Sequence, residues 1–483
     1  MKKEHNPTMK KENYDIVVVG AGSGGLNVAS FFGRLPLRVL LIDKSDSHIG
    51  GDCLNTGCVP SKALIHVANQ IYGGVQAHRF YNSLSTHPEI DIQKVMSYVK
   101  SKQDFIRQSE NPDYLRKKGI TYISGTAVFT GTNSIAVEET EYTAKKIILA
   151  TGSRPRVLDI ESDNSITQYT NETIFDINFL PKKFVFIGGG PINCELGQAF
   201  SRLGAKVTIL HTGARILEKE TEEVSSILTD SFRKEGIDVI PIVTIHSIKN
   251  KQVQYSTDQN KELISVDADA VYIGIGRVLN IEGLDLEKAG VQYNQQRTKL
   301  CIDDALRTTN KDIYAVGDVA GNFQFTHAAE MHAKHVISEM LSPISKKFKS
   351  TDIAWVTYTS PQIATWGISK SEATTRKCEI LHTRFTHDDR AIVDEYQEGS
   401  LSIYLNTKNQ IVGGTLISEN AGEISQELLL AMSSGIPVQA LFNKVYPYPT
   451  ASRINKQLVS QKMAQKLTKI NTYILAFLFK IKS

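Results

Sequence analysis

The sequence has little cysteine, little net charge and no basic block in its body. Its 483 residues include five cysteines, and only Cys53 and Cys58 lie close together. Scattered cysteines do not form the disulfide framework of a small secreted protein, so we expect a cytoplasmic location. A formal net charge of +4 without a basic block gives nucleic-acid binding little support. The N-terminus carries no apolar segment with a cleavage site, so no signal peptide is expected.

The length and composition indicate a globular protein with several domains. A chain of 483 residues is too long for a single hydrophobic core and should divide into about three domains. The apolar fraction of 41% and the charged fraction of 22% are ordinary for such a protein.

A glycine-rich turn follows the first expected strand. The segment DIVVVGAGSGGLNVASFF places Gly20, Gly22 and Gly25 between a strand at 16–19 and a helical pattern. The first glycine permits a tight turn, the second lets backbone N–H groups approach a pyrophosphate, and the third lets helix and strand pack closely. Asp43 ends the next strand, where a carboxylate would hold a ribose hydroxyl. The pattern predicts a dinucleotide site, and a turn that serves packing alone is the alternative.

A second segment, KKFVFIGGGPINCELGQAFSRLGAKVTILH, repeats this arrangement with changes. Gly188 and Gly190 match the first two glycines, whereas Asn193 occupies the third position. The following strand ends at His211 instead of an acid, and His211 with Arg215 could tolerate a 2′-phosphate. The expectation therefore leans toward NADPH, and NADH stays open. Two such sites need two dinucleotides. A flavin and a nicotinamide are the simplest pair, because one can pass a hydride to the other.

The segment GGDCLNTGCVPSKAL contains the cysteine pair. A metal site needs about four ligands, but the other cysteines are scattered and no Cys/His cluster accompanies the pair, so no metal is expected. On a regular helix, residues five apart are too far separated for a disulfide, so the segment must be distorted, and Gly57 and Pro60 allow this. A strained, accessible disulfide is typical of redox work, whereas packing alone would suit a single buried cysteine.

These motifs together resemble the class I pyridine nucleotide–disulfide oxidoreductases, which include glutathione reductase, dihydrolipoamide dehydrogenase and mercuric reductase. The resemblance covers roughly residues 14–460. It implies an α/β fold with two Rossmann-like dinucleotide-binding domains and a C-terminal α+β dimerisation domain, FAD and NADPH or NADH as cofactors, and a homodimer. The expected parts are an N-terminal extension (1–13), an FAD-binding domain (14–160, with a return segment at 281–345), an NAD(P)-binding domain (161–280), a dimerisation domain (346–460) and a tail (461–483).

The resemblance also implies roles for single residues. Cys53 would be the thiol that meets the substrate, and Cys58 the thiol beside the flavin. Lys62 matches a lysine near the flavin, and Glu195 matches the glutamate that pairs with it. Tyr448 completes the expected catalytic set. Further cofactor contacts are expected in the segments IILATGSRP, DIYAVGDVAG and FTHAAEMHA and at two single glycines, namely at Gly51, Thr151, Gly152, Gly276, Asp318 and Thr326.

The segment VYPYPTASR departs from the family pattern. Tyr448 stands where the family has a histidine lent to the partner's active site, and Arg453 stands where it has the supporting glutamate. Tyrosine, with a pKa of about 10, does not titrate near neutrality, and a guanidinium group only donates hydrogen bonds. Ordinary glutathione or lipoamide reduction is therefore not expected. Tyrosine here is similar to mercuric reductase, but the C-terminal cysteine pair of that enzyme is missing, since the last cysteine is Cys378.

We therefore expect an NAD(P)H-dependent flavoprotein that passes electrons through the Cys53–Cys58 disulfide to a disulfide, a soft metal or another acceptor. The alternatives are a quinone reductase or diaphorase that bypasses the cysteines, and a redox sensor with little turnover. The tail contains five lysines and no acid. Its helical pattern predicts either contact with a membrane surface or docking on the protein itself, which vesicle flotation would separate. The apolar positions are Met463, Leu467, Ile470, Ile474, Phe477, Leu478 and Ile481.

Overall fold

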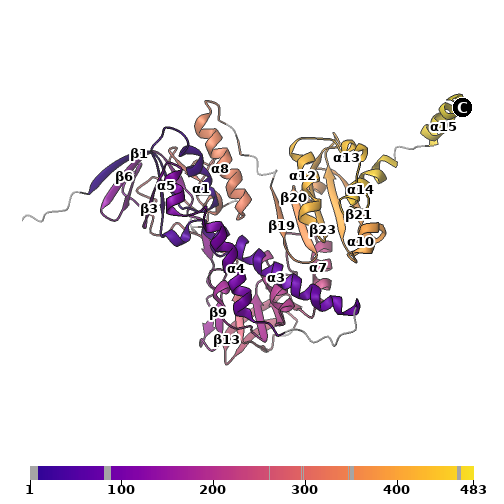
Figure 1. Cartoon of the computed structure of the whole chain (residues 1–483), viewed down its shortest axis with the longest axis horizontal. Coiled ribbons are helices and arrows are strands. Elements are labelled where there is room, and N and C mark those ends of the chain that lie inside the picture. Colours follow the sequence, from indigo (N-terminus) through magenta and orange to yellow (C-terminus); the bar gives the residue numbers. More distant parts are fainter. Residues whose placement is uncertain are drawn as a thin grey trace, which may run out of the picture. The chain divides into compact units, whose positions relative to one another are not determined.

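Figure 1 shows the computed structural model of the chain, which describes residues 9–80, 89–259, 261–294, 296, 298–321, 323–345, 347–348, 353–464 and 469–482. The chain forms two compact units. The first comprises the residues up to Gly188 together with Ala199–Thr208 and Thr244–Phe348, and the second comprises Gly189–Gln198, Ile209–Val243 and the residues after Phe348. Each unit mixes helices with sheets, so the α/β class expected from the sequence is confirmed.

A seven-stranded sheet forms the core of the first unit, with the order β3-β2-β1-β6-β5-β4 and β18 paired with β6. Its strands are β1 (Lys10–Val19), β2 (Val39–Asp43), β3 (Ile120–Ser124), β4 (Val128–Phe129), β5 (Ser134–Val137), β6 (Thr140–Leu149) and β18 (Ile313–Ala315). Residues 16–19 of β1 are β-branched and buried, as expected for a strand covered on both faces. The strand begins earlier than the expected 16–19 because Lys10 already pairs with Thr140 of β6.

Two helices cover this sheet at the glycine turn. Figure 1 shows α1 (Ser23–Phe32) beside α8 (Thr326–Leu341). A Cβ atom on Gly24 would lie 2.6 Å from a methyl group of Val316, so the helix packs closely on the residue after β18 only because Gly24 has no side chain. Because β1, β2 and β6 run parallel, their carboxyl ends meet at one edge of the sheet. Ligands of open α/β sheets bind at such an edge.

A second sheet has the strand order β12-β11-β10-β16-β9, in which β10, β16 and β9 run parallel. Its strands are β9 (Thr167–Tyr169), β10 (Lys183–Ile187), β11 (Lys206–Leu210), β12 (Asp238–Ile240) and β16 (Ala270–Ile273). Two smaller sheets accompany it, formed by β8 (Glu161–Ser162), β13 (Val243–Lys249), β14 (Gln252–Thr257) and β15 (Ile264–Asp267), and by β7 (Ser153–Pro155) and β17 (Arg277–Leu279). The turn from β10 into α6 (Pro191–Arg202) is the second glycine-rich loop.

The C-terminal part of the second unit is built on an antiparallel sheet with the order β19-β20-β23-β22-β21. Its strands are β19 (Ala354–Thr357), β20 (Gln362–Gly367), β21 (Glu379–Arg384), β22 (Ser400–Leu405) and β23 (Ile411–Ser418). Trp366 and Phe385 are fully buried in its core. The remaining helices of the chain are α2 (Gly51–Asn55), α3 (Cys58–Gln76), α4 (Ile92–Arg107), α5 (Pro112–Lys117), α7 (Glu222–Lys234), α9 (Lys370–Thr375), α10 (Asp389–Val393), α11 (Ala421–Ile424), α12 (Gln426–Ser433), α13 (Gln439–Asn443), α14 (Arg453–Ala464) and α15 (Lys469–Lys482).

The tail forms two helices, α14 and α15. Seven large apolar side chains of α15 are exposed, namely Tyr473, Ile474, Leu475, Phe477, Leu478, Phe479 and Ile481. Leu467 lies outside the described residues, and so does the side chain of Ile470. Among the described helices, none has the length and apolar character needed to cross a bilayer. Contact of the tail with a membrane surface stays a prediction.

Candidate active site

The first glycine loop is closed by backbone contacts that leave no room for side chains. Gly20 has a φ of +108°, and a Cβ atom on Gly25 would lie 1.9 Å from the carbonyl oxygen of Gly20. Gly51 also has a positive φ of +58°, and its Cβ atom would lie 2.7 Å from the Cα atom of Gly22. Asp43 accepts a hydrogen bond from the backbone N–H of Ala21 at 2.6 Å. The acid thus lies against the loop at the end of β2, where the sequence predicts it.

A polar cluster lies at the same sheet edge. Ser153 donates to the carboxylate of Asp318, and the Nε atom of Arg277 donates to the hydroxyl of Ser153 at 2.6 Å. Arg277 also pairs with Asp52 and lies 3.6 Å from Asp318. Burial raises the pKa of Asp318, although Ser153 and Arg277 act in the opposite direction. Sequence reasoning missed Arg277, whose only signal was its place directly after Gly276.

The residues at this edge of the sheet have the open space and the polar group that a bound dinucleotide would need. The hydroxyl of Thr151 is buried and has no hydrogen-bond partner among the described residues. Gly152 and Gly276 have φ values of +70° and +105°, and a Cβ atom on either would meet nothing within 4 Å. Open space beside an unpartnered buried hydroxyl group is the arrangement that a bound polar cofactor would complete. FAD therefore fits the residues present.

The cysteine segment is distorted as the sequence predicts. Cys53 lies in α2 and Cys58 begins α3, and the helix is interrupted between them. A Cβ atom on Gly57 would lie 2.8 Å from the carbonyl oxygen of Asp52, so the interruption needs a glycine. Cys58 is exposed and Cys53 is half-buried. The pKa of Cys53 is raised, first by its hydrogen bond with Cys58 and then by burial.

The N-terminus of α8 meets the cysteine pair. The Sγ atom of Cys58 lies 3.3 Å from the hydroxyl oxygen of Thr326, the first residue of this 16-residue helix. The positive end of a helix dipole stabilises a nearby thiolate. The Cys58 sulfur is therefore the one of the pair that the structure places at a helix N-terminus. Lys62 lies one turn further along α3, and its Nζ atom donates to the Ser61 hydroxyl at 3.3 Å.

Glu195 lies in the second unit and is nearly buried, with 5% of its surface exposed. Its carboxylate accepts a hydrogen bond from the backbone N–H of Tyr358 at 2.8 Å. This contact ties α6 to the residues that follow β19. The pairing of Glu195 with Lys62 stays a prediction.

The second glycine loop has a different environment from the first. Gly188 has a φ of +116°, and a Cβ atom on Gly190 would meet nothing within 4 Å. Asn193, at the place of the third glycine, is buried. The ring of His211 packs on this loop, and burial lowers its pKa. Arg215 donates to the carbonyl oxygens of Glu218 and Glu220, at 3.3 and 3.2 Å.

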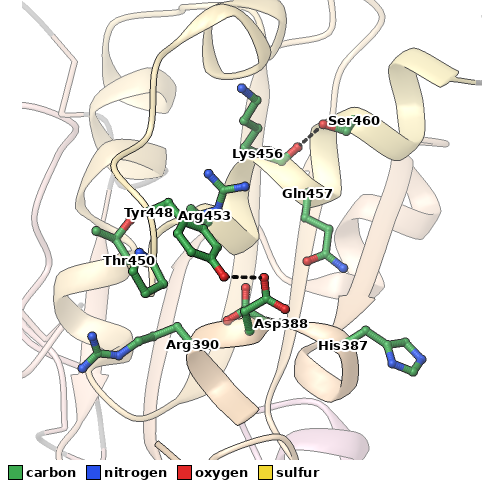
Figure 2. A pocket seen from close by; sticks show the side chains of 11 residues that line it. His387, Asp388, Arg390, Tyr448, Thr450, Arg453, Lys456, Gln457 and Ser460 are labelled. Carbon is green, nitrogen blue, oxygen red and sulfur yellow. Dashed lines mark hydrogen bonds between the residues drawn. The ribbon is translucent and has the colours of Figure 1, made fainter. Parts of the chain in front are cut away.

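Tyr448 borders a cavity of about 290 Å³ in the second unit (Figure 2). Its hydroxyl donates to the carboxylate of Asp389 at 3.2 Å, and this hydrogen bond raises the pKa of Tyr448. The guanidinium group of Arg453 lies 5.2 Å from the centre of the tyrosine ring. Arg390 and Lys456 also line the cavity. A tyrosine held in this way is ionised even less near neutral pH than the sequence predicts, so its phenolate is not available as a base there.

Comparisons with known proteins agree with this geometry. Residues 14–333 match the family model of the pyridine nucleotide-disulphide oxidoreductases, and residues 353–458 match the dimerisation domain of the same family. The match to the dimerisation domain supports a homodimer. Among the relatives, the mercuric reductase of Staphylococcus aureus is 28% identical over 91% of this chain and 80% of its own length. The dihydrolipoyl dehydrogenase of Buchnera aphidicola is 30% identical over 92% and 95%, respectively.

A solved structure also covers nearly the whole fold. The HOCl-induced flavoprotein disulfide reductase RclA from Escherichia coli superposes with a TM-score of 0.82 at 25% identity, covering 92% of this chain and 99% of that protein. The family match spans both the flavin-side residues and the second glycine loop. The chain therefore belongs to the pyridine nucleotide–disulphide oxidoreductases, as an enzyme that uses FAD and NAD(P)H.

Proposed function

We propose that this enzyme uses NAD(P)H to reduce a Cys53–Cys58 disulfide and that the resulting dithiol reduces a soft metal ion. The observation that carries the proposal is the joint placement of the two sulfur atoms and the N-terminus of α8, with Cys58 3.3 Å from Thr326. In the first half-reaction NAD(P)H, a proton and the disulfide become NAD(P)⁺ and two thiols. FAD, when bound, supplies the two-electron relay between the nicotinamide and the sulfur atoms.

The residues of the pair have different tasks. Cys58 holds the negative charge of the reduced pair at the helix N-terminus. Cys53 keeps its proton because its pKa is raised, so it needs either a general base or an acceptor that displaces the proton. A thiol that coordinates a metal ion is deprotonated by the coordination itself. A soft divalent ion would then take two electrons, and the pair would return to the disulfide. Of the two protons of the dithiol, one leaves when Cys58 ionises and the other leaves when the metal displaces it from Cys53.

The C-terminal segment supports a metal over a disulfide as acceptor. Reduction of a disulfide substrate needs a group that takes and returns a proton near neutral pH. At the position where the family has a histidine, this chain has Tyr448, whose pKa is raised by Asp389. Arg453, at the position of the supporting glutamate, only donates hydrogen bonds. Mercuric reductases stand among the relatives of the chain, beside dihydrolipoyl dehydrogenases.

Cys53→Ser is the variant that tests the proposal. Oxidation of NADH and NADPH by the purified holoenzyme would be followed with Hg(II), with a small disulfide and with a quinone. We expect Cys53→Ser to lose metal-dependent turnover and to keep reduction of the flavin. Cys301→Ser is the matched control, because Cys301 is an exposed thiol outside the pair. Full metal-dependent turnover in Cys53→Ser would show that the mechanism is wrong.

The same assay separates the alternatives. A wild-type enzyme that reduces a small disulfide but not the metal would overturn the acceptor that we propose. Quinone turnover that survives in Cys53→Ser, without metal turnover in the wild type, would favour a quinone reductase. Negligible rates with all three acceptors would favour a redox sensor. Anaerobic titration adds a direct readout, since a long-wavelength absorption band after two electrons reports a thiolate beside the flavin.

A further inference from the structure

The end of β11 lacks an acid in the sequence, but the fold brings one there. Glu218 accepts a hydrogen bond from the backbone N–H of Ala214 at 3.0 Å, and its Oε1 atom lies 4.0 Å from the Nε2 atom of His211, the residue after β11. A Cβ atom on Gly213 would lie 2.0 Å from this carboxylate oxygen. The missing side chain of Gly213 is therefore what lets the carboxylate fold back over the end of the strand.

The neighbouring backbone fixes Glu218 against the glycine loop. The N–H of Leu217 donates to the carbonyl oxygen of Gly189 at 2.8 Å, so the residue before the acid is attached to the loop directly. Glu220 accepts hydrogen bonds from the side chains of Trp355 and Thr365, which anchors the segment on its other side. The side chain of Glu218 is 51% exposed, and its carboxylate is accessible to a ligand.

The two basic residues of this segment are both engaged within the protein. Burial lowers the pKa of His211, so its ring is neutral near pH 7, and its Nε2 atom has no hydrogen-bond partner among the described residues. The guanidinium group of Arg215 is turned toward the carbonyl oxygens of Glu218 and Glu220. A 2′-phosphate at the strand end would therefore meet the Glu218 carboxylate, beside a neutral His211 and an Arg215 whose guanidinium group donates to backbone carbonyl oxygens.

We infer that Glu218 selects NADH over NADPH by accepting hydrogen bonds from the adenosine ribose hydroxyls and by repelling a 2′-phosphate. The inference rests on the use of the second glycine loop for the nicotinamide nucleotide, and it reverses the preference that the strand-end histidine predicts. An acid at the end of this strand is the general device for binding the ribose of NAD. Here the device is assembled from a residue seven positions further along the chain, through Gly213 and the Leu217–Gly189 hydrogen bond.

Equilibrium binding tests the inference without turnover. Titration calorimetry of the FAD-loaded enzyme would measure the Kd of NAD⁺ and of NADP⁺, with 5′-AMP and adenosine 2′,5′-bisphosphate as probes of the adenosine half alone. We expect the wild type to bind NAD⁺ roughly tenfold or more tightly than NADP⁺, since a hydrogen bond to a charged group is lost and a repulsion gained. Glu218→Gln should reduce this ratio roughly tenfold or more, because the amide removes the charge.

The control variant also removes one negative charge, but at a different position in the same groove. Glu222→Gln removes an acid from the surface groove that also contains Glu218, in the first turn of α7, and should leave the ratio unchanged. Equal or tighter binding of NADP⁺ by the wild type would overturn the inference while the proposed function stands. An unchanged ratio in Glu218→Gln would also overturn it. If the wild type binds neither nucleotide, the use of this loop is wrong, and with it both the inference and the proposed function.

Discussion

The two glycine loops of this enzyme reach a similar arrangement by different routes. In the first, every residue stands where the spacing pattern requires it, and Asp43 at the strand end accepts the N–H of Ala21. In the second, Asn193 replaces the third glycine and is buried. The carboxylate at the second strand end comes from Glu218, in a separate turn. In the first loop the acid is thus positioned by the local spacing of residues, and in the second it is positioned by tertiary contacts.

The largest difference between the two loops is expected in the effect of replacing a glycine by alanine. Gly25→Ala would place a Cβ atom 1.9 Å from the carbonyl oxygen of Gly20, whereas Gly190→Ala meets open space. We expect Gly25→Ala to lose flavin and to lower the free energy of unfolding by about 3 kcal/mol. Gly190→Ala should change that free energy by less than about 0.5 kcal/mol, although it narrows the nucleotide site. Flavin absorbance measures the loss of flavin, and urea unfolding measures the free energy of unfolding of each variant. Equal stability of the two variants would contradict the comparison.

A second difference lies in the pH dependence of the stability of the first unit. His332 is fully buried in α8, its Nδ1 atom accepts the N–H of Gly317 at 3.2 Å, and burial lowers its pKa to about 4. The neighbouring His335 lowers it further. Because the unfolded state takes up the proton at a pH of about 6.5, stability is full above that value and is lost as the pH falls toward 4.

The loss should reach about 3 kcal/mol across this range. Urea unfolding at about pH 7.5 and about pH 5, followed by flavin fluorescence, should show about 2 kcal/mol of this loss, because pH 5 covers only part of the range. His332→Asn keeps an acceptor for the N–H of Gly317 and removes the titration, so most of the pH dependence should disappear. A wild-type slope that persists in His332→Asn would show that other groups cause it. His211 of the second loop is only partly buried and should contribute less.

The smallest effect is expected where the second unit departs from the family pattern. A Tyr448→His/Arg453→Glu enzyme would regain a titratable base with a carboxylate to orient it. We expect its turnover with a small disulfide to rise by about tenfold, because general base catalysis becomes available near neutral pH. Steady-state kinetics with a disulfide and with Hg(II) would measure it. No gain with the disulfide would mean that a step other than proton transfer limits the rate.

The local geometry of the first glycine loop and of the cysteine segment could be predicted because its signals are local. Gly20, Gly22 and Gly25 stand at fixed spacing after a strand, and the cysteine segment contains its own helix-breaking glycine. The role of Arg277 could not be predicted in this way. It meets Asp52, Ser153 and Asp318 only because β17 pairs with β7 at the same sheet edge as the cysteine segment.

The sequence by itself determined the family and the α/β architecture, and it predicts the two nucleotide loops and the redox pair, because each depends on residue types at short, regular spacing. Only the tertiary structure decided which charge lies at the end of β11. Glu218 reaches that point through a turn at Gly213 and a hydrogen bond from Leu217 to Gly189, and no spacing rule encodes either contact. Likewise, only the fold decided that Asp389 holds the hydroxyl of Tyr448. The position of a charged side chain depends on contacts between loops that are distant in the sequence, whereas a glycine turn depends on the residues next to it in the chain.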